Sequence, residues 1–300
     1  MVKKTKILIS AKKNHDIVKG VIDKLKQEKG YNFIFHDPTK DFLDLQNIAE
    51  LFKGVDFLIV KVRNDCSIDL LHYAKLHGIP TLHDLDAVMN CKNKVALDHA
   101  LRKTFYDNPD LTEKFLLPKS WTQSLRNVDR FKKWAKPRLP IVIKSHYQHD
   151  KYMRFNFLVK KIEEIDIFCK RYEQFLYYDV YIQEFIECDG IDRKIYVVDD
   201  QIFGIKRENP IYIYLRDNPD DIDVDVIERE DYEVSDDIHR LTRALSKGLN
   251  LKIFGFDLIK PIDQDRYCLV DLNDFPGFRG INDIESVLVD FILENIKNIK

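Results

Sequence analysis

Two acidic residues and an asparagine near the carboxyl-terminal end of the chain have the types and spacing of a metal site. Asp257 lies in Phe254–Ile259, which alternates like a strand, and Asp271 and Asn273 follow the apolar run Cys268–Val270. Side chains two positions apart on a strand point the same way, so Asp271 and Asn273 share one face.

The segment between the two strands predicts how these side chains meet. It contains Pro261 and the polar run Asp263–Arg266, which is typical of a turn between antiparallel strands. Such a hairpin would place Asp257 beside Asp271 and Asn273. Two carboxylates and a carboxamide are hard oxygen ligands, and they suit magnesium with positions left open for phosphate oxygens and water. Without a cation, two buried carboxylates on adjacent strands would repel each other.

The same residues also fit a simpler interpretation. Asp, Asn, Pro and Gly all favour turns, so Asp271–Asp274 could be a polar turn before Pro276 and Gly277. Spacing alone does not separate the two interpretations, and the rest of the chain must decide between them.

Basic residues stand where an α/β fold would collect an anion. Lys12 and Lys13 follow the first predicted strand directly, and Lys61 comes just after the buried strand Phe57–Val60. The carboxyl ends of parallel strands form the ligand crevice of α/β folds. These lysines therefore predict an anion pocket.

Further cations fit a phosphate site. Lys144 ends the apolar strand Ile141–Lys144, where a lysine suits a phosphate, and Lys194 and Arg207 lie in consecutive strands. If the last two face the metal residues, they could neutralise a transferring phosphoryl group. Each of these cations also fits a solvated surface position.

Two segments add weaker signals. The loop 145–154 has two histidines and could close over phosphates, although a solvated loop is the simpler interpretation. The strand Ile182–Glu187 could offer backbone groups to an adenine edge, as any edge strand could.

Composition limits the possible classes of protein. The chain has 300 residues and a net charge of -2, so no overall basic field predicts nucleic acid as a partner. Runs of apolar residues stay far below the roughly 20 needed to cross a bilayer. The five cysteines are odd in number and never form Cys-x-x-Cys. They predict reduced thiols in the cytoplasm, with neither a disulfide framework nor a zinc site.

Periodicity predicts alternating strands and helices in residues 1–84, a small Rossmann-like unit without Gly-x-Gly-x-x-Gly. The expected strands are Lys6–Ser10, Tyr31–His36, Phe57–Val60, Ile79–Leu82, Ile141–Lys144, Tyr177–Phe185, Asp192–Phe203 and Gln201–Lys206. The expected helices are Asp16–Lys29, Gln46–Lys53, Leu70–His77, Lys94–Phe105, Val128–Trp134, Phe155–Arg171, Ser235–Leu249 and one from Asp283 onward. Residues 216–234 are expected to be an acidic loop.

Taken in order, these segments resemble the ATP-grasp superfamily and, within it, the inositol-tetrakisphosphate 1-kinase / inositol-trisphosphate 5/6-kinase family. The resemblance covers nearly the whole chain. It rests on Ile9–Lys13, Val60–Lys61, Lys92–Lys94, Val142–Lys144, Gln183–Ile186, Lys194, Arg207, Phe254–Asp257 and Val270–Gly277. The last segment, with its Asp-x-Asn-x-Phe-Pro-Gly pattern, is the most specific.

The resemblance implies a role for each matching residue. It assigns ATP binding to Lys92, Lys94, Lys144, Gln183, Glu184, Ile186 and Arg207, with the choice between Lys92 and Lys94 left open. It assigns the acceptor to Lys13, Lys61, His149, Lys194, Asn273 and Gly277. Metal binding falls to Asp257, Asp271 and Asn273, and catalysis to Lys194, Arg207 and His149.

The loop after Lys144 departs from the family pattern. The family expects a sequence like Ala-His-Gly and then a second histidine. Here His149 matches the first histidine by distance, Asp150 replaces the glycine, and the second histidine falls near Lys151 or Arg154. The resemblance therefore leaves the preferred acceptor and the hydroxyl attacked open.

We predict an ATP-grasp fold of class α/β and α+β, in which two lobes clamp ATP between antiparallel sheets. The expected domains are an N-terminal Rossmann-like domain (1–88), a central lobe (89–184) and a C-terminal lobe with the magnesium site (185–300). The expected activity transfers the γ-phosphoryl group of ATP to a hydroxyl of an inositol tris- or tetrakisphosphate, with two Mg²⁺ ions. We expect a cytoplasmic monomer without nucleic-acid partners or membrane insertion.

Two rival functions share part of this signal. An ATP-grasp ligase that joins a carboxylate to an amine would need the metal residues and Lys144, but does not obviously need Lys13 and Lys61. A non-catalytic module that senses an inositol phosphate or a nucleotide would fit the altered loop at Asp150. The complete set of metal residues favours an enzyme.

Overall fold

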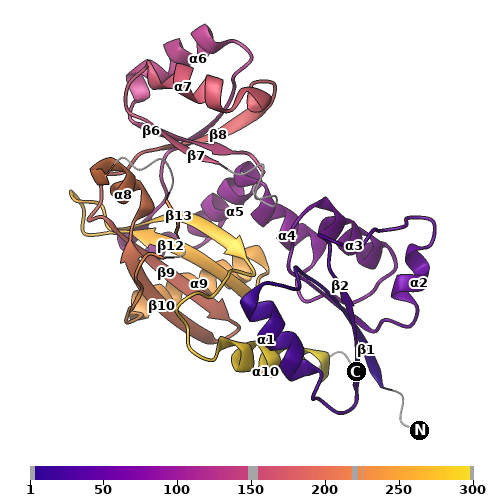
Figure 1. The fold of residues 1–300 in the computed structure, drawn as a ribbon. Coiled ribbons are helices and arrows are strands. Elements are labelled where there is room, and N and C mark those ends of the chain that lie inside the picture. The colour runs from indigo at the N-terminus through magenta and orange to yellow at the C-terminus, as the bar shows by residue number, and fades with distance from the viewer. Residues whose placement is uncertain (1–3, 148–154, 218–221, 225, 298–300) are drawn as a thin grey trace.

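The computed structural model describes residues 4–147, 155–217, 222–224 and 226–297. It contains three β-sheets, which Figure 1 shows as separate bodies along the chain. The first sheet is parallel, the second is antiparallel, and the third is antiparallel except for one short strand. We call them the N-terminal, small and large sheets.

The N-terminal sheet has the order β2-β1-β3, with β1 (Thr5–Ser10), β2 (Tyr31–His36) and β3 (Phe57–Val60). Its helices are α1 (Asp16–Leu25), α2 (Ile48–Phe52) and α3 (Asp65–Leu76). Helix α1 buries Val18, Val21, Ile22 and Leu25, the spacing of one helical face. The alternation of strands and helices confirms the Rossmann-like unit predicted for this part of the chain. The predicted strand Ile79–Leu82 was wrong, because this segment forms only an isolated bridge between Leu58 and Thr81.

The small sheet has the order β5-β8-β6-β7 and is antiparallel throughout. Its strands are β5 (Ser120–Ser124), β6 (Ile141–Ser145), β7 (Asn156–Val159) and β8 (Asp179–Glu184). Ile141, Ile143, Val180 and Ile182 pack in one core with residues of α6 (Val128–Ala135) and α7 (Glu164–Arg171). Because side chains alternate along a strand, Lys144, Tyr181 and Gln183 lie on the opposite face.

The large sheet has the order β11-β10-β9-β12-β13-β4. Its strands are β4 (Phe115–Leu116), β9 (Ile191–Val198), β10 (Gln201–Glu208), β11 (Glu230–Asp231), β12 (Ile253–Ile259) and β13 (Tyr267–Asp274). One face packs against α5 (Lys94–Asp107) and α9 (Asp236–Leu249). The Ser235 side chain accepts a hydrogen bond from the backbone of Ile238, so the predicted cap of α9 is confirmed.

The other face of the large sheet changes character along its strands. Tyr196, Val198 and Ile253 pack in one apolar core with the N-terminal sheet, α1 and α10 (Ile284–Lys297). Figure 1 shows α1 and α10 side by side, in agreement with their many contacts. Farther along the same strands, Lys194 and Asp257 replace the apolar residues and face an open space. The apolar core therefore covers only part of this face of the large sheet and leaves the part with Lys194 and Asp257 uncovered.

The remaining described elements are α4 (Leu85–Lys92), α8 (Pro210–Asp217) and the 3-10 helices Pro109–Glu113, Lys136–Arg138 and Glu173–Phe175. All five cysteines are free, as predicted. Among the helices of the described ranges, none combines the length and apolar character that crossing a membrane requires.

The prediction of one helix over Phe155–Arg171 was wrong. Residues 156–159 form β7, which pairs with β6, and the helix begins only at Glu164. The run Phe155–Val159 is short and apolar, so its periodicity fits a strand or a helix, and pairing with β6 decides the outcome.

Three smaller corrections concern other segments. The predicted strand Asp192–Phe203 is two strands, β9 and β10, which meet at a turn where Asp199 has a φ of 54°. The predicted loop 216–234 begins within α8 and contains β11, which pairs with β10. Helix α4 had not been predicted, because Leu85–Lys92 is only eight residues long.

Candidate active site

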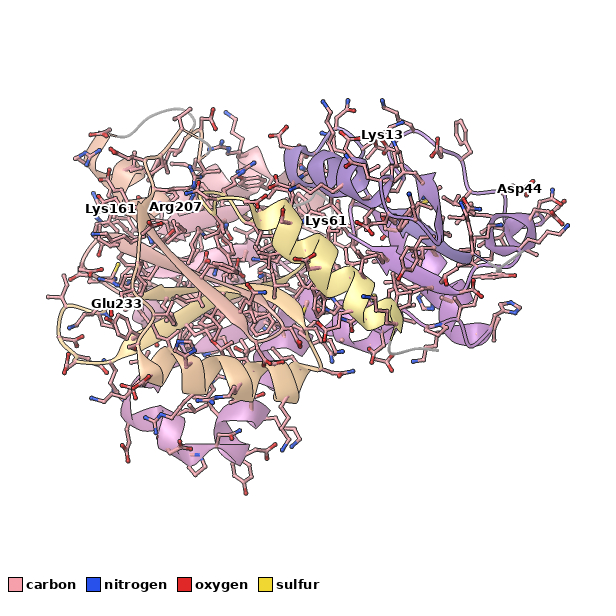
Figure 2. The ribbon with its side chains drawn as sticks, turned by 90° about the horizontal axis from the view of Figure 1, so that it is seen from below. Lys13, Asp44, Lys61, Lys161, Arg207 and Glu233 are labelled. Atoms are coloured by element: carbon pink, nitrogen blue, oxygen red, sulfur yellow. The ribbon has the colours of Figure 1, made fainter. Side chains whose placement is uncertain are left out.

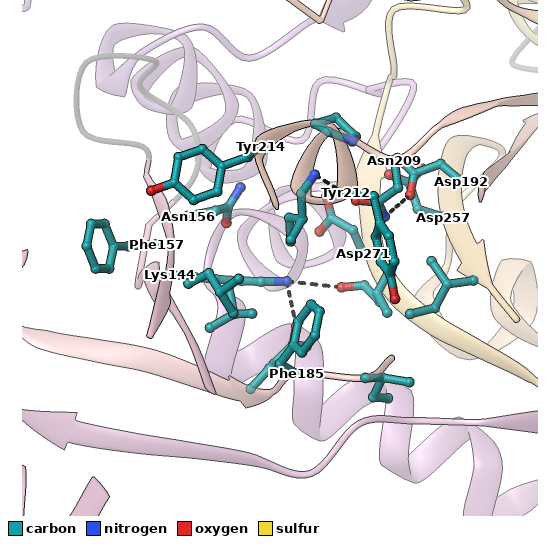
Figure 3. Close-up of a pocket in the computed structure, with 18 of the residues that line it drawn as sticks. Lys144, Asn156, Phe157, Phe185, Asp192, Asn209, Tyr212, Tyr214, Asp257 and Asp271 are labelled. Carbon is teal, nitrogen blue, oxygen red and sulfur yellow. Dashed lines mark hydrogen bonds between the residues drawn. The ribbon is translucent and has the colours of Figure 1, made fainter. Parts of the chain in front are cut away.

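A cavity of about 600 Å³ lies between the small and large sheets. The small sheet contributes Lys144 and Gln183 to its wall, and the large sheet contributes Lys194, Asp257 and Asp271. Helix α8 borders the same cavity with Tyr212 and Tyr214, which are labelled among the lining residues in Figure 3. Two antiparallel sheets therefore enclose a space of the size that suits a small-molecule ligand.

The predicted metal residues meet as the hairpin β12–β13 requires. Asp257 and Asp271 are direct partners across the two strands. The Asn273 side chain donates a hydrogen bond of 3.0 Å to Asp271. The prediction that the hairpin brings these three side chains together is confirmed, and the alternative of a simple polar turn is wrong, because Asp271 and Asn273 lie within β13.

Each carboxylate of this trio is bound to a lysine. Lys194 lies directly opposite Asp257 on β9 and donates a hydrogen bond of 2.5 Å to it, and Lys94 of α5 forms an ion pair with Asp271. Burial alone would raise the pKa of Asp271, but Lys94 and Lys144 outweigh it and hold that pKa well below its usual range. Asp271 is thus held as an anion by neighbouring positive charge.

The donor set fits magnesium. The trio supplies oxygen ligands. The ammonium groups of Lys94 and Lys194 balance the negative charge of the two carboxylates, as a divalent ion would. Within the described ranges, no group of three or more His, Cys, Asp or Glu side chains could hold a metal ion alone. A magnesium ion here would need further oxygen ligands, such as those of a phosphate.

Lys144 reaches toward the trio from the small sheet. Its ammonium group donates to the Gln183 side chain at 2.5 Å and to the Val270 carbonyl oxygen at 3.3 Å (Figure 3). The pairing of β12 with β13 shifts register beside Asp257, which is a β-bulge that leaves Val270 without a partner and its carbonyl free for Lys144. Burial lowers the pKa of Lys144 to about 8.

The two lysines between which the sequence could not choose occupy different surroundings. Lys94 lines the cavity, whereas Lys92 lies outside the residues that line it and forms a buried ion pair with Asp274. Lys92 therefore links α4 to the end of β13, directly after the predicted metal residues.

Two of the remaining predicted acceptor residues, Lys61 and Lys13, are not among the residues that line the cavity. Lys61 donates to the backbone carbonyls of Phe275 and Pro276, the second at 2.9 Å, and its pKa is lowered to about 7 by burial and by Lys92. The Lys13 side chain is exposed, and Figure 2 shows it well separated from Arg207.

Two further predicted acceptor residues are Gly277 and His149. Gly277 follows the loop that Lys61 holds, and His149 lies outside the described residues. The structure therefore brings Asn273, Lys194 and Arg207 to the cavity wall but does not bring Lys13 and Lys61 there.

Arg207 lines the cavity together with two residues that the sequence analysis missed. Its guanidinium group donates to Asp192 at 3.3 Å, and the Asn209 side chain donates to the same carboxylate at 2.5 Å. Burial, strengthened by Asp257, raises the pKa of Asp192 to about 6. Strand alternation could have found Asp192, because it stands two residues before Lys194 and so shares its face.

The predicted adenine hinge runs along the cavity. The N–H of Glu184 donates to Lys119 at 2.9 Å and that of Phe185 donates to Pro140 at 3.1 Å. Among the described residues, the backbone N–H and C=O of Ile186 have no hydrogen-bond partner. The hinge therefore offers one donor and one acceptor of the backbone at Ile186.

Known proteins resemble this chain in sequence. A family model described as the inositol 1,3,4-trisphosphate 5/6-kinase ATP-grasp domain matches residues 213–294. Inositol-tetrakisphosphate 1-kinase 1 of Arabidopsis thaliana is 22% identical over 327 residues, which cover 96% of this chain and 94% of that protein. Inositol-tetrakisphosphate 1-kinase 1 of Oryza sativa subsp. indica is 32% identical over 135 residues, 39% of this chain and 38% of that protein.

Solved structures resemble it in fold. D-alanyl-alanine synthetase A from Vibrio cholerae has a TM-score of 0.68 at 14% identity and covers 100% of this chain and 99% of that chain. A RimK domain ATP-grasp protein from Sphaerobacter thermophilus has a TM-score of 0.70 at 14% identity, with 96% and 100% covered.

These likenesses define the class first: the chain has the ATP-grasp fold, as predicted. Within that class, the family model and the curated relatives confirm its resemblance to the inositol-tetrakisphosphate 1-kinase / inositol-trisphosphate 5/6-kinase family.

Proposed function

We propose that the protein is an inositol polyphosphate kinase, which transfers the γ-phosphoryl group of ATP to a free hydroxyl of an inositol tris- or tetrakisphosphate. One observation carries the proposal: Lys194, Asp257 and Asp271 lie in a row across three adjacent strands and face Lys144 across the cavity. A magnesium ion that takes the two carboxylates would free Lys94 and Lys194 to bind phosphates. The carboxylates would thus bind the metal ion, and the lysines released from them would bind the phosphates.

Positions in the cavity suggest how the chain would handle ATP. Ile186 would bind the adenine edge through its backbone, and Lys144 and Lys94 would bind the phosphates. Asp257, Asp271 and Asn273 would hold Mg²⁺, which supplies Lewis-acid charge compensation on the phosphate oxygens.

The opposite end of the cavity would receive the acceptor. Lys194 and Arg207 carry positive charge there, which would stabilise the transferring phosphoryl group. The bond from phosphorus to the ADP oxygen breaks as the acceptor oxygen bonds to phosphorus, and the hydroxyl proton leaves to solvent. Catalysis would come chiefly from position and charge.

The acceptor would reach the cavity from the side of the N-terminal domain. We retain Lys13, Lys61, Gly277 and His149 as its proposed contacts. The bond from Lys61 to the loop carbonyls gives this lysine a second proposed task, which is to hold the loop between the metal residues and Gly277 in place.

We further propose that domain 1–88 binds the acceptor, that domain 89–184 forms one wall of the ATP site, and that domain 185–300 contains the metal site. A cytoplasmic monomer with two Mg²⁺ ions per ATP remains our expectation. An ATP-grasp ligase is the main alternative, because its fold and metal residues would be the same.

Chromatography of MgATP reactions tests the proposal. The acceptor panel would contain inositol tris-, tetrakis- and pentakisphosphates, with amino acids and peptides in parallel, and ADP would be measured in each reaction. A new inositol phosphate with one more phosphate, formed in equal amount with ADP, would support the kinase. ADP formed only with amino acids or peptides would support the ligase, and acceptor binding without turnover would support a sensor.

A further inference from the structure

A chain of hydrogen bonds runs behind Lys144, away from the cavity. Lys144 donates to the Oε1 atom of Gln183 at 2.5 Å, and the Nε2 atom of Gln183 donates to the Tyr181 hydroxyl at 2.9 Å. That hydroxyl donates to Oδ1 of Asp98 at 2.9 Å. The chain thus links a lysine of the small sheet to helix α5.

The two ends of this chain fix the direction of every bond in it. An ammonium group only donates and a carboxylate only accepts, so the Gln183 amide must turn its oxygen toward Lys144 and its nitrogen toward Tyr181. The Tyr181 hydroxyl, which accepts from Gln183, must then give its proton to Asp98. A reversed amide would point a donor at the Lys144 ammonium group, and its oxygen would compete with Asp98 for the single proton of the Tyr181 hydroxyl.

The sheet geometry places these groups together. Tyr181 is the direct partner of Lys144 across β8 and β6, and Gln183 stands two residues farther on the same face. Tyr181 is 4% exposed and Gln183 is 8% exposed, so water does not readily replace either bond. Burial and the nearby Asp98 raise the pKa of Tyr181, which keeps its hydroxyl protonated as a donor.

Asp98 is itself held firmly. Its carboxylate accepts hydrogen bonds from Ser120 at 2.7 Å and from Arg102 at 2.7 Å. It lies one helical turn after Lys94, so α5 presents Asp98 to the hydrogen-bond chain and Lys94 to Asp271. Helix α5 therefore contacts both the hydrogen-bond chain behind Lys144 and the predicted metal residue Asp271.

We propose that Tyr181 and Asp98 are positioning residues for nucleotide binding, which orient the Gln183 amide so that it holds the Lys144 ammonium group at the cavity wall. This inference rests on the proposed function for the claim that Lys144 binds the phosphates of ATP. Neither Tyr181 nor Asp98 lines the nucleotide cavity, so each acts through Gln183.

Titration calorimetry with MgADP, which binds without turnover, measures the effect. The Tyr181→Phe variant removes one oxygen atom and leaves the Gln183 amide nitrogen buried without an acceptor. We expect the dissociation constant of MgADP to rise about 5- to 50-fold. Tyr178→Phe is the matched control, because Tyr178 is 60% exposed near the same strand, and it should leave the constant unchanged.

A double-mutant cycle separates positioning from loss of structure. Gln183→Leu breaks the chain, so adding Tyr181→Phe to it should weaken MgADP binding by less than about twofold further. Asp98→Asn keeps the shape of the side chain and should give a smaller loss than Tyr181→Phe. The inference is overturned if Tyr181→Phe raises the dissociation constant of MgADP by the same factor in the Gln183→Leu variant as in the wild type. It is also overturned if the Tyr181→Phe variant binds MgADP like the wild type.

The outcomes also distinguish this inference from the proposed function. A wild-type protein that binds MgADP but phosphorylates no inositol phosphate would contradict the proposed activity and leave the hydrogen-bond chain supported by its own cycle. A wild-type protein that binds no nucleotide would overturn both.

Discussion

The large sheet meets its two neighbours in opposite ways. Toward the N-terminal sheet it forms one continuous apolar core, in which Ile7, Tyr196 and Leu288 are all buried. Toward the small sheet it borders a cavity, and a polar contact crosses that cavity, the hydrogen bond from Lys144 to the Val270 carbonyl oxygen. Among the described residues, the apolar core of the small sheet contains only residues between 121 and 182, so this sheet has a core of its own.

This difference explains where a ligand can bind. Apolar burial is strong and without direction, so the contact with the N-terminal sheet excludes water and ligands alike. Polar groups at the other contact exchange their partners at little net cost, because a ligand can replace each bond. Both arrangements use the same face of β9 and β12, and the chain changes from one to the other within four residues, between Lys194 and Val198.

The largest expected effect comes from removing the central charge of the polar contact. Asp271→Asn keeps the shape of the side chain but loses its charge, which we expect to reduce phosphoryl transfer about 1,000-fold. ADP formation with the best acceptor measures it. Asp263→Asn, in the exposed turn of the same hairpin, is the control and should retain full activity. Retained activity in Asp271→Asn would assign the metal site to other residues.

The next effect tests the apolar contact. Leu288→Ala in α10 creates a cavity in the shared core, which should lower the free energy of unfolding by about 2–5 kcal/mol. Urea unfolding measures the loss, and Leu45→Ala, at a side chain that is 70% exposed, should cost less than about 0.5 kcal/mol. Equal losses of unfolding free energy in the two variants would mean that this apolar core does not join the N-terminal sheet to the large sheet.

A matched substitution in the small sheet sharpens the comparison. Phe168→Ala should cost about 3–5 kcal/mol, but the loss should stay within the small sheet and its helices. Hydrogen exchange should speed up in β6 and β8 while β1 and β3 keep their protection. If exchange speeds up equally in all three sheets, the small sheet is not an independent unit.

The smallest expected effect is a pH dependence of the polar contact. Because burial lowers the pKa of Lys144 to about 8, this lysine loses its charge as the pH rises above 8 in the nucleotide-free protein. MgADP affinity should then fall by up to about tenfold per pH unit. Lys144→Arg keeps its charge at these pH values and should show a flatter profile. The same profile in both proteins would mean that another group titrates.

Local patterns were enough to predict the hairpin of β12 and β13 and the three side chains that it brings together. Strand alternation placed Asp271 and Asn273 on one face, and the polar turn near Pro261 placed Asp257 beside them. The lysines that pair with these carboxylates could not be predicted as partners, because 177 residues separate Lys94 from Asp271.

The segments and contacts that were predicted wrongly or missed also depend on partners elsewhere in the chain. The segment Asn156–Val159 is a strand because β6 offers it a partner, which no local signal shows. Asp98 lies 83 residues from the Tyr181 hydroxyl that it accepts from, so the hydrogen-bond chain was invisible in the sequence. Asp192, in contrast, could have been found from its spacing to Lys194.

Hydrogen exchange of the wild-type protein with and without MgADP tests most directly whether the polar contact is the nucleotide site. The account predicts slower exchange in β8, in the hinge residues 183–186 and in β12 and β13, with no change in β1 and α10. Protection confined to the N-terminal sheet, or no protection at MgADP concentrations that saturate binding, would contradict it.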